Sequence, residues 1–399
     1  MLEAFLYDGL RSPFGRHAGC LAGVRPDDLV AEVMRAVMAR SPWKPEEVED
    51  VLLGCTNQAG EDSRNVARHA ALLAGFPATT PAQTVNRLCA SGLAAVVDAA
   101  RAVTCGEGEL YLAGGVESMS RAPFAMAKAE VPWSREVRVF DTTIGARFAN
   151  PRHVKAWGAD SMPETGNNVA RDYGITREEA DRFAEGSQRK FEKARAAGFY
   201  AGEIHPVSAP SRKGPPAAVK EDEHPRPDTT LDGLAKLKPL FEGGVVTAGN
   251  ASGINDGAAA LLVGNRAVGE RAGKKPLCRI LAAGAVGVEP RVMGIGPVGA
   301  IRKALARAGL KLADMDVIEI NEAFASQVLS CLKLLEVPFD DSRVNPNGGA
   351  IAVGHPLGAS GARLALTVAR ELQRRGGRYA VASLCIGVGQ GLAMVIERA

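Results

Sequence analysis

PAQTVNRLCASGLAAVVDAARAVT, residues 81–104, joins a short β-branched run to a long segment of small residues. Before Cys89, Thr84 and Val85 favour a strand. After Cys89, apolar residues recur at every third or fourth position, which predicts a helix. Small side chains would let this helix lie deep inside a core. The stretch therefore predicts a strand, a tight turn that contains Cys89, and a buried helix.

Cys89 has two interpretations. A thiol at the first turn of a helix faces unpaired backbone N–H groups and the positive end of the helix dipole, which favours the thiolate and a nucleophilic role. The alternative is a buried structural cysteine, because free cysteines are among the most buried residues. The rest of the chain has to decide between them.

Length and composition limit the class of protein. A chain of 399 residues exceeds the usual size of one core, so we expect two or three packed units. The net charge is +3, and no basic cluster could follow a phosphate backbone, which argues against nucleic-acid binding. The seven cysteines are widely spaced without a C-x-x-C pair, as expected in a reducing compartment.

The chain shows no pattern typical of a secretory signal or a membrane helix. The first residues carry charge from Glu3 onward and lack a continuous apolar run. Residues 344–362 are uncharged, but their glycines and prolines do not suit a spanning helix. We therefore expect a cytoplasmic protein with no membrane segment.

Strand-like and helix-like segments alternate in the first part of the chain. This alternation predicts a mostly parallel sheet that is covered by helices. The expected strands are residues 2–6, 48–53 and 110–113, and the expected helices begin at residues 25–28 and span 65–73.

Residues 120–248 have a different character, with tryptophans, prolines, many charges and one amphipathic helix at residues 177–197. We interpret this region as an inserted loop domain. Long excursions of this kind usually form lids or contact surfaces.

Three segments of the C-terminal part echo three of the N-terminal part in the same order, which a duplication explains. We expect two similar α/β halves, residues 1–119 with 249–271 and residues 272–399, packed together with a loop domain at 120–248. The ends of corresponding strands would then gather at one place, which predicts the site. The echoing segments are 49–54 with 315–320, 85–86 with 344–345, and 110–115 with 379–387.

Asn321 follows the predicted strand at residues 317–320. Ligands of open α/β sheets bind at the carboxyl ends of strands, so its side chain could donate to a substrate or to bound water. The alternative is a helix cap, for which asparagine is a preferred residue.

His355 and Cys385 complete the set of candidates. His355 lies in the glycine-rich run NPNGGAIAVGHPLGASG, where the backbone can approach a ligand and an imidazole can act as a base or a donor. Cys385 follows the predicted strand at residues 379–384, and we place it opposite Cys89 in the repeat. Two strand-end cysteines, this histidine and Asn321 are together far more specific than any one of them.

Several other chemistries lack their motifs. No phosphate-binding G-x-x-x-x-G-K-[ST] loop occurs, and no G-x-G-x-x-G follows a strand to open a helix. No H-E-x-x-H or comparable ligand cluster is present. We expect no metal and no tightly bound cofactor.

The chain resembles the thiolases, or acyl-CoA C-acetyltransferases, over essentially its whole length. Five motifs carry the resemblance: NRLCASG around Cys89, VTAGNASGINDGAAA from Val246, NEAFA from Asn321, GGAIAVGHPLGASG around His355, and CIGVGQG from Cys385. Within the family it is most similar to thiolases that cleave 3-oxoadipyl-CoA, through QAGEDSRNVAR, GGVESMSRAPF, FDTTIG and DSMPET.

The resemblance implies two βαβαβαββ halves with a loop domain, a homodimer or homotetramer, and coenzyme A as co-substrate. It implies that Cys89 is the acylated nucleophile, that His355 is its base, and that Cys385 is the acid and base at the α-carbon. Asn321 would hold a water molecule. The backbone N–H groups of Cys89 and Gly387 would form an oxyanion hole.

Three further residues are carried over from the family as substrate contacts. Ser252 would lie near the pantetheine arm of CoA and Arg226 near its nucleotide end, and Met162 would also contact the substrate. Ser161 departs from the histidine that biosynthetic acetoacetyl-CoA thiolases tend to have before Met162, which argues against a short-chain biosynthetic role.

The sequence therefore predicts a degradative thiolase that converts 3-oxoadipyl-CoA and CoA to succinyl-CoA and acetyl-CoA. The first alternative is a generic acetyl-CoA acetyltransferase or 3-ketoacyl-CoA thiolase of fatty-acid metabolism. Cys385 argues against a decarboxylating ketoacyl synthase, and a non-catalytic CoA-binding protein would lack one of the reactive groups. A substrate carboxylate would need a cation, and the candidates that stay open are Arg121, Arg147, Arg152 and Lys155.

Overall fold

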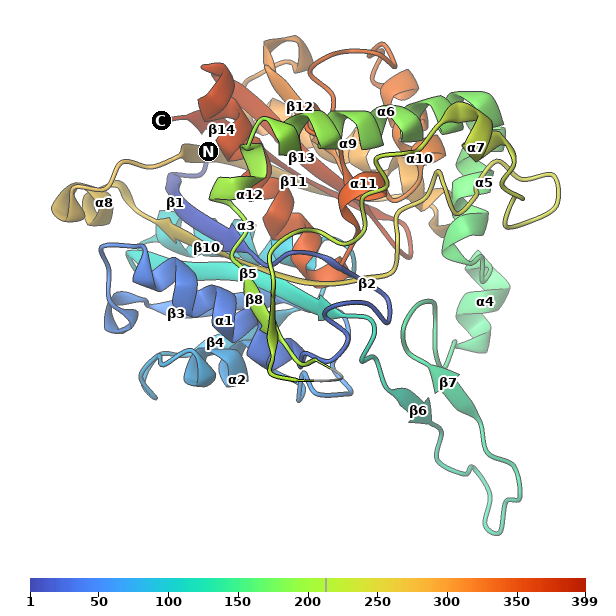
Figure 1. Cartoon of the computed structure of the whole chain (residues 1–399), viewed down its shortest axis with the longest axis horizontal. Helices are drawn as coiled ribbons and strands as arrows, with labels where there is room; N and C mark the ends of the chain where they lie inside the picture. Colours follow the sequence, from blue (N-terminus) through green and yellow to red (C-terminus); the bar gives the residue numbers. More distant parts are fainter. Residues whose placement is uncertain (212–213) are drawn as a thin grey trace.

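The computed structural model describes residues 1–211 and 214–399, so two positions of the predicted loop domain lie outside the described residues. The two halves of the chain carry their helices and strands in the same order (Figure 1). The N-terminal half comprises β1 (Ala4–Arg11), α1 (Pro26–Ala39), β3 (Asp50–Gly54), α2 (Val66–Leu73), β4 (Ala82–Val85), α3 (Ser91–Cys105), β5 (Leu110–Ser118) and β10 (Asn255–Gly264). The C-terminal half comprises β11 (Cys278–Gly287), α9 (Gly296–Ala308), β12 (Val317–Ile320), α10 (Ala325–Leu334), α12 (Leu357–Arg375), β13 (Tyr379–Ile386) and β14 (Gln390–Arg398).

Both halves also pair their strands in the same order. The order is β4-β3-β5-β10-β1 in one half and β12-β13-β14-β11 in the other. The C-terminal counterpart of β4 is a single bridge between Ile318 and Val344. β1 pairs with β11, Ala4 opposite Ile280, and this pairing joins the halves. The predicted fold of two similar α/β halves is confirmed.

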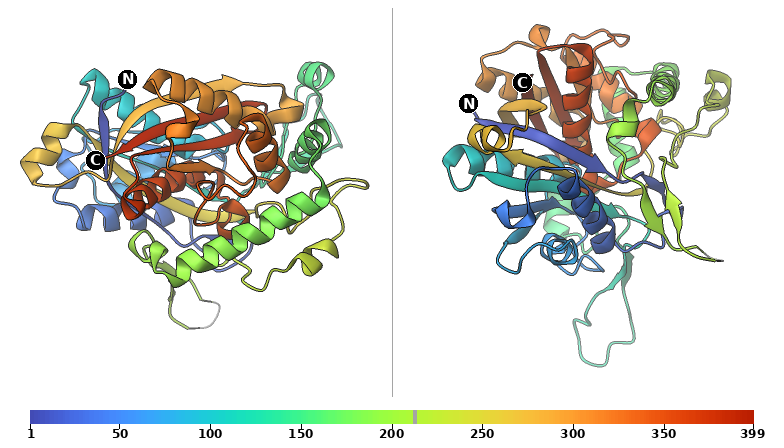
Figure 2. Two further views of the ribbon diagram at one scale, coloured as in Figure 1. Left: turned by 90° about the horizontal axis from the view of Figure 1, so that it is seen from above. Right: turned by 60° about the vertical axis from the view of Figure 1, so that its left-hand side comes forward.

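Helices α3 and α12 lie between the two halves of the continuous sheet and form the centre of the core, while α1 and α2 cover one outer face and α9 and α10 the other (Figure 2). The two central helices approach closely because glycines face one another. A Cβ atom on Gly92 would lie 2.5 Å from the carbonyl oxygen of Gly358, and one on Gly361 would lie 2.3 Å from the backbone nitrogen of Leu93. The small residues seen in the sequence therefore bring the helix after Cys89 against the helix after His355.

The prediction of a mostly parallel sheet is wrong. Only the pairs β3–β4, β3–β5 and β12–β13 are parallel among the strands of the main sheet that the structure describes. β14 returns directly from β13 through a tight turn, and β10 returns beside β5 after the loop region, so both of these pairs are antiparallel. Alternation of strands and helices predicts the elements but not these return strands.

Residues 120–248 surround one side of this core, and a hairpin of β6 and β7 projects away from the body (Figure 1). The predicted amphipathic helix is confirmed as α6 (Arg177–Ala196). The limits proposed for the loop domain and for the halves stay a prediction. The region also contains β6 (Phe124–Met126), β7 (Val139–Asp141), α4 (Pro151–Trp157), α5 (Met162–Tyr173), β8 (Val207–Ala209), β9 (Ala217–Val219) and α7 (Leu231–Ala235). The remaining elements are β2 (Gly15–Arg16), α8 (Arg266–Ala272), α11 (Ala350–Val353) and the 3₁₀ helices Pro45–Glu47, Phe199–Gly202, Pro290–Ile295 and Leu312–Asp314.

One helical stretch, Leu88–Cys105, is long and apolar enough by length and composition to cross a membrane. It consists mainly of α3, most of which is buried between the two halves of the sheet. Its apolar character is explained by this position at the centre of the core.

Candidate active site

Cys89 lies in the turn between β4 and α3, as the sequence predicts, and the residue as a whole is half-buried. The residue before it, Leu88, has a positive φ of 45°, which is unfavourable for leucine. The side-chain oxygen of Asn86 accepts the N–H of Leu88 at 3.0 Å and holds this conformation. The turn thus presents the thiol at the edge of the core.

The expected thiolate at Cys89 is not favoured in the free protein. Burial raises the pKa of the Cys89 thiol, whereas the backbone N–H groups of Gly387 and of Cys89 itself point at the sulfur and oppose the rise. Desolvation outweighs these N–H groups, so the thiol needs a base. The same two N–H groups lie where they could stabilise an oxyanion formed next to the sulfur.

Cys385 lies at the end of β13, and Gly387 opens the turn to β14. The Cys385 side chain is only 1% exposed. Burial raises its pKa well above the ordinary value, and the nearby Cys89 adds to this effect. A Cβ atom on Gly387 would lie 3.3 Å from Leu88 Cδ1 and 3.8 Å from Met162 Sδ. The structure therefore brings Cys89, Cys385, Gly387 and Met162 together.

His355 is buried just before α12, and hydrogen bonds fix both its backbone and its ring. Its N–H donates to Asn255 Oδ1 at 2.8 Å, and its Nδ1 lies 2.6 Å from Ser360 Oγ. Burial, and secondly the charge of Arg363, lower the pKa of His355 to about 3. The ring is therefore neutral at pH 7 and able to accept a proton.

Asn321 follows β12 and lies beside this imidazole. Its Nδ2 is 3.4 Å from His355 Nε2, while its buried Oδ1 has no hydrogen-bond partner among the described residues. Helix α10 begins only at Ala325, with Phe324 in the cap position, so the interpretation of Asn321 as a helix cap is wrong. An unpartnered amide oxygen in a buried place is what a water-holding or ligand-holding role requires.

Glu322 ties the loop after β12 to the loop before His355, and sequence reasoning missed it. Its carboxylate accepts from Asn345 Nδ2 at 2.9 Å, from Ser187 Oγ at 2.6 Å and from the N–H of Ile351 at 3.1 Å. A Glu within NEAFA, directly after the candidate Asn321, was the available signal. The carboxylate fixes the loops that position Asn321 and His355.

An apolar wall surrounds Cys385. Val246, Met293, Ala323 and Phe324 pack with its side chain, and Met162 and Ala251 lie against them. Sequence reasoning missed Met293 and Phe324, because an apolar residue carries no local sign that it faces a site. Ser252 adjoins this wall, since its N–H donates to the carbonyl of Ala323 at 2.9 Å.

Arg226 lies outside this cluster. It is exposed, and its backbone N–H donates to Gln188 Oε1 at 2.9 Å. Its neighbour His224 packs against Gly253, the residue after Ser252, because a Cβ atom on Gly253 would lie 2.2 Å from the imidazole. Arg226 is thus connected to the Ser252 segment but lies farther out toward solvent.

The four cations proposed for a substrate carboxylate are not equivalent. Arg121 is committed to a bidentate ion pair with Glu61. Arg147 donates to the carbonyl of Thr142 at 3.4 Å, and Arg152 and Lys155 are exposed on α4. Arg121 is therefore the weakest of the four candidates.

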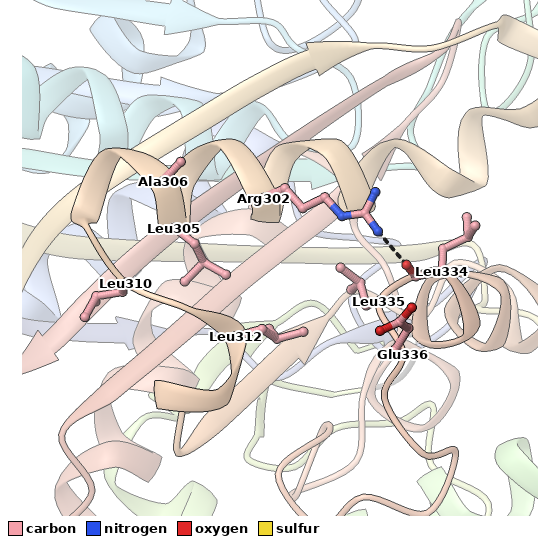
Figure 3. A pocket seen from close by; sticks show the side chains of 8 residues that line it. All are labelled: Arg302, Leu305, Ala306, Leu310, Leu312, Leu334, Leu335 and Glu336. Atoms are coloured by element: carbon pink, nitrogen blue, oxygen red, sulfur yellow. Dashed lines mark hydrogen bonds between the residues drawn. The ribbon is translucent and has the colours of Figure 1, made fainter.

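A surface pocket of about 390 Å³ lies elsewhere, between α9, the loop after it and the end of α10 (Figure 3). Arg302 spans one side of it and donates to the carbonyl of Leu334 at 2.6 Å. None of the candidate residues lines it. Its lining residues are Arg302, Leu305, Ala306, Leu310, Leu312, Leu334, Leu335 and Glu336. Within residues 1–211 and 214–399 there is also no group of three or more His, Cys, Asp or Glu side chains that could hold a metal ion.

The chain matches two family descriptions over nearly its whole length. Residues 5–267 match the thiolase N-terminal domain, and residues 274–398 match the thiolase C-terminal domain. The chain therefore belongs to the thiolase family of acyltransferases, and the resemblance found in the motifs is confirmed.

Individual relatives agree with this assignment. The chain is 56% identical over 400 residues to a beta-ketoadipyl-CoA thiolase of Escherichia coli, covering all of both chains. It is also 56% identical over 400 residues to the 3-oxoadipyl-CoA/3-oxo-5,6-dehydrosuberyl-CoA thiolase of Escherichia coli K12, again covering all of both chains. The crystal structure of human mitochondrial 3-ketoacyl-CoA thiolase in complex with CoA superimposes with a TM-score of 0.92 at 39% identity, covering 100% of this chain and 98% of that chain.

Proposed function

We propose that this thiolase cleaves 3-oxoadipyl-CoA with CoA to give succinyl-CoA and acetyl-CoA. The observation that carries the proposal is the full-length identity of 56% to thiolases named for this substrate. Two thiols, a neutral imidazole and two backbone N–H groups together supply the chemistry that such a cleavage needs.

The proposed reaction begins when His355 Nε2 takes the proton of Cys89. The thiolate attacks the 3-oxo carbon, and the N–H groups of Cys89 and Gly387 stabilise the oxyanion. The bond between the carbonyl carbon and the α-carbon then breaks, which leaves a succinyl group on Cys89 and the enolate of acetyl-CoA. Cys385 protonates the α-carbon, while His355 and a water molecule on Asn321 stabilise the enolate oxygen. CoA then gives its thiol proton to the Cys385 thiolate and attacks the acyl-cysteine, and Cys89 leaves as a thiolate that regains the proton held by His355, which releases succinyl-CoA and restores the starting state.

CoA enters this proposal as a substrate, with no tightly bound cofactor and no metal. Ser252 would contact the pantetheine arm and Arg226 the nucleotide end, which agrees with the outward course from Ser252 through His224 to Arg226. Met162 would contact the acyl group, since it packs beside Gly387 and Cys385.

A specific observation favours a second candidate, a generic 3-ketoacyl-CoA thiolase. The wall around Cys385 is apolar, and no cation belongs to it among the described residues. The two candidates differ in turnover of 3-oxoadipyl-CoA and of 3-oxohexanoyl-CoA, which has the same chain length without the carboxylate. We expect kcat/KM to be at least about tenfold higher for 3-oxoadipyl-CoA, since one charge-assisted contact is worth about 1.5–3 kcal/mol. Equal values would favour the second candidate.

We further propose that the chain works as a homo-oligomer in the cytoplasm. The β6–β7 hairpin exposes large apolar side chains, of which Trp133 is 97% and Phe124 75% exposed, and a second copy of the chain would cover them. All seven cysteines are free thiols, which suits the reducing cytoplasm. Light scattering should give the mass of a dimer or tetramer, and Phe124→Asp with Trp133→Asp should lower that mass. A monomeric wild-type protein would contradict the proposal.

A further inference from the structure

Glu117 is a buried carboxylate to which the proposed reaction assigns no role. Glu117 is the last residue but one of β5 and is 3% exposed. No Lys or Arg pairs with it in the described part of the chain. Its Oε2 accepts the N–H groups of Thr56 at 3.0 Å and Gly358 at 2.9 Å, and its Oε1 accepts the N–H of Asn57 at 3.1 Å. Burying a carboxylate without a cation is costly, and these three backbone donors offset part of the cost, while burial still raises the pKa of Glu117.

One of these hydrogen bonds leads to the nucleophile. The carbonyl oxygen of Thr56 accepts from Asn86 Nδ2 at 3.1 Å, and Asn86 Oδ1 in turn accepts the N–H of Leu88 at 3.0 Å. Leu88 is the residue with the unfavourable positive φ directly before Cys89. Glu117 therefore supports the conformation that presents the Cys89 thiol.

The hydrogen bond between Glu117 and the N–H of Gly358 leads to the proposed base, His355, in the opposite half of the molecule. Gly358 lies in the first turn of α12, between His355 and Ser360, the residue that contacts the imidazole. The turn has no freedom to shift toward β5, since a Cβ atom on Gly358 would lie 2.3 Å from the carbonyl oxygen of Val116. The carboxylate thus ties β5 to the first turn of α12, the helix that follows His355.

We propose that Glu117 is a positioning residue that fixes the Cys89 turn and the His355 loop relative to each other. The proposal rests on the roles assigned above to Cys89 and His355. A displacement of reacting groups by about 1 Å can cost about 10²-fold in rate. Loss of the carboxylate should therefore act on turnover more than on substrate binding.

The first test is Glu117→Gln, which keeps the shape but turns an NH₂ group toward a backbone donor. We expect kcat for thiolysis to fall by about 10²-fold, with KM for CoA unchanged within about twofold. The matched control is Glu371→Gln, a buried glutamate farther along α12 that binds Asn347, Arg374 and Arg375. Glu371→Gln should keep the wild-type kcat. A wild-type kcat for Glu117→Gln overturns the proposal, whether or not that variant lowers the melting temperature.

A second variant keeps the test informative if Glu117→Gln does not fold. Asn86→Ala removes the link between Thr56 and Leu88 at an exposed position, and it should slow acetylation of Cys89 by acetyl-CoA while KM stays unchanged. Acetylation at the wild-type rate would overturn the proposal. Where both variants fold, the double variant should be about as slow as Glu117→Gln alone, because the two residues act through one chain of hydrogen bonds. Additive losses would also overturn it.

The wild-type protein separates this inference from the proposed function. Mass spectrometry after incubation with acetyl-CoA should place the acetyl group on Cys89. A label on another cysteine would remove the proposed roles and the positioning role together. A label on Cys89 with unaffected variants would remove the positioning role alone.

Discussion

Cys89 and His355 each lie just before one of the two central helices of the molecule. Each lies two residues before the first residue of a buried helix, Cys89 before Ser91 of α3 and His355 before Leu357 of α12. Cys385 instead ends β13, the counterpart of β5, whereas Cys89 precedes α3, so the placement of Cys385 opposite Cys89 in the repeat is wrong. Because the two helices pack against each other through glycines, the duplication itself brings the proposed nucleophile and its base to the same region.

The first prediction concerns the orientation of the His355 ring. The Ser360 hydroxyl donates to the carbonyl of Pro356 at 2.8 Å, so its oxygen is left to accept from Nδ1–H of the imidazole. This arrangement leaves Nε2 unprotonated and directed toward Asn321. Ser360→Ala should lower kcat by up to about tenfold, the effect of losing one hydrogen bond of about 0.5–1.5 kcal/mol.

A matched control exists for Ser360. Ser330 is also a buried helical serine that donates to the carbonyl four residues earlier, at 2.8 Å, but it contacts no proposed catalytic group. Ser330→Ala should leave kcat unchanged. Equal kcat values for the two variants in a steady-state assay would show that Ser360 does not orient the ring.

The second prediction separates the two cysteines. Cys385→Ala should still transfer acetyl groups from acetyl-CoA to Cys89 and on to CoA, because that exchange breaks no carbon–carbon bond. Thiolysis should fall by about 10²–10⁴-fold, as expected for loss of a general acid or base. Cys89→Ala should abolish both reactions. Exchange of label between CoA pools, measured beside thiolysis, distinguishes these outcomes.

The control for Cys385 is Cys278→Ala, which removes another fully buried thiol, in β11. It should keep both reactions. Exchange of the acetyl-CoA α-protons in deuterated water is a further check, and a Cys385→Ala enzyme with normal exchange would contradict the role proposed for Cys385.

These residues also show which parts of the site can be predicted from the sequence. The positions of Cys89, His355 and Asn321 follow from local patterns, a strand followed by a turn or a helix of small residues. Glu322, Met293 and Phe324 could not be recognised, because their roles depend on contacts between segments that are far apart in the chain. The same reason explains why the expectation of a thiolate at Cys89 was wrong. The start of a helix is a local feature of the sequence, whereas the burial that raises the pKa of the thiol depends on the whole fold.

The sequence pattern likewise could not predict which neighbouring strands run antiparallel. The pattern of strands and helices predicts the parallel trio β4, β3 and β5, where each connection contains a helix. It does not predict that β10 returns beside β5 after more than a hundred residues of other structure. The halves were nevertheless recognisable, because the order of elements survives even where one strand has shrunk to the bridge at Val344.

The third prediction concerns the glycine before His355. Gly354 has a φ of 106°, and a Cβ atom there would lie 2.6 Å from Cγ of Asn255, whose Oδ1 accepts the N–H of His355. Gly354→Ala should displace Asn255 and reduce kcat by about 10²-fold through misplacement of the imidazole. Gly376→Ala is the control, since Gly376 has a φ of 66° with no atom near its missing Cβ.

The comparison of the two glycines separates backbone strain from the collision with Asn255. Gly376→Ala should lower the free energy of unfolding by about 1–2 kcal/mol, the cost of a left-handed conformation, and keep the wild-type kcat. If both variants lose stability alike and neither loses activity, Asn255 does not position His355.

The last prediction is a loss of stability in acid. Burial, and secondly Arg363, lower the pKa of His355 to about 3, while burial, followed by Arg226 and Arg16, lowers the pKa of His224 to about 4, both from 6.5. Below about pH 6.5 the unfolded chain binds protons that the folded chain does not bind, so the free energy of unfolding should fall by about 1.4 kcal/mol per pH unit for each histidine. Above pH 6.5 both rings are neutral in both states, and this contribution no longer changes with pH. Urea unfolding of the wild type and of His224→Asn at pH 7.5, 6.0 and 5.0 tests this, because the variant should lose about 1 kcal/mol less between the two lower pH values. Identical losses in the two proteins would show that His224 takes up its proton without unfolding.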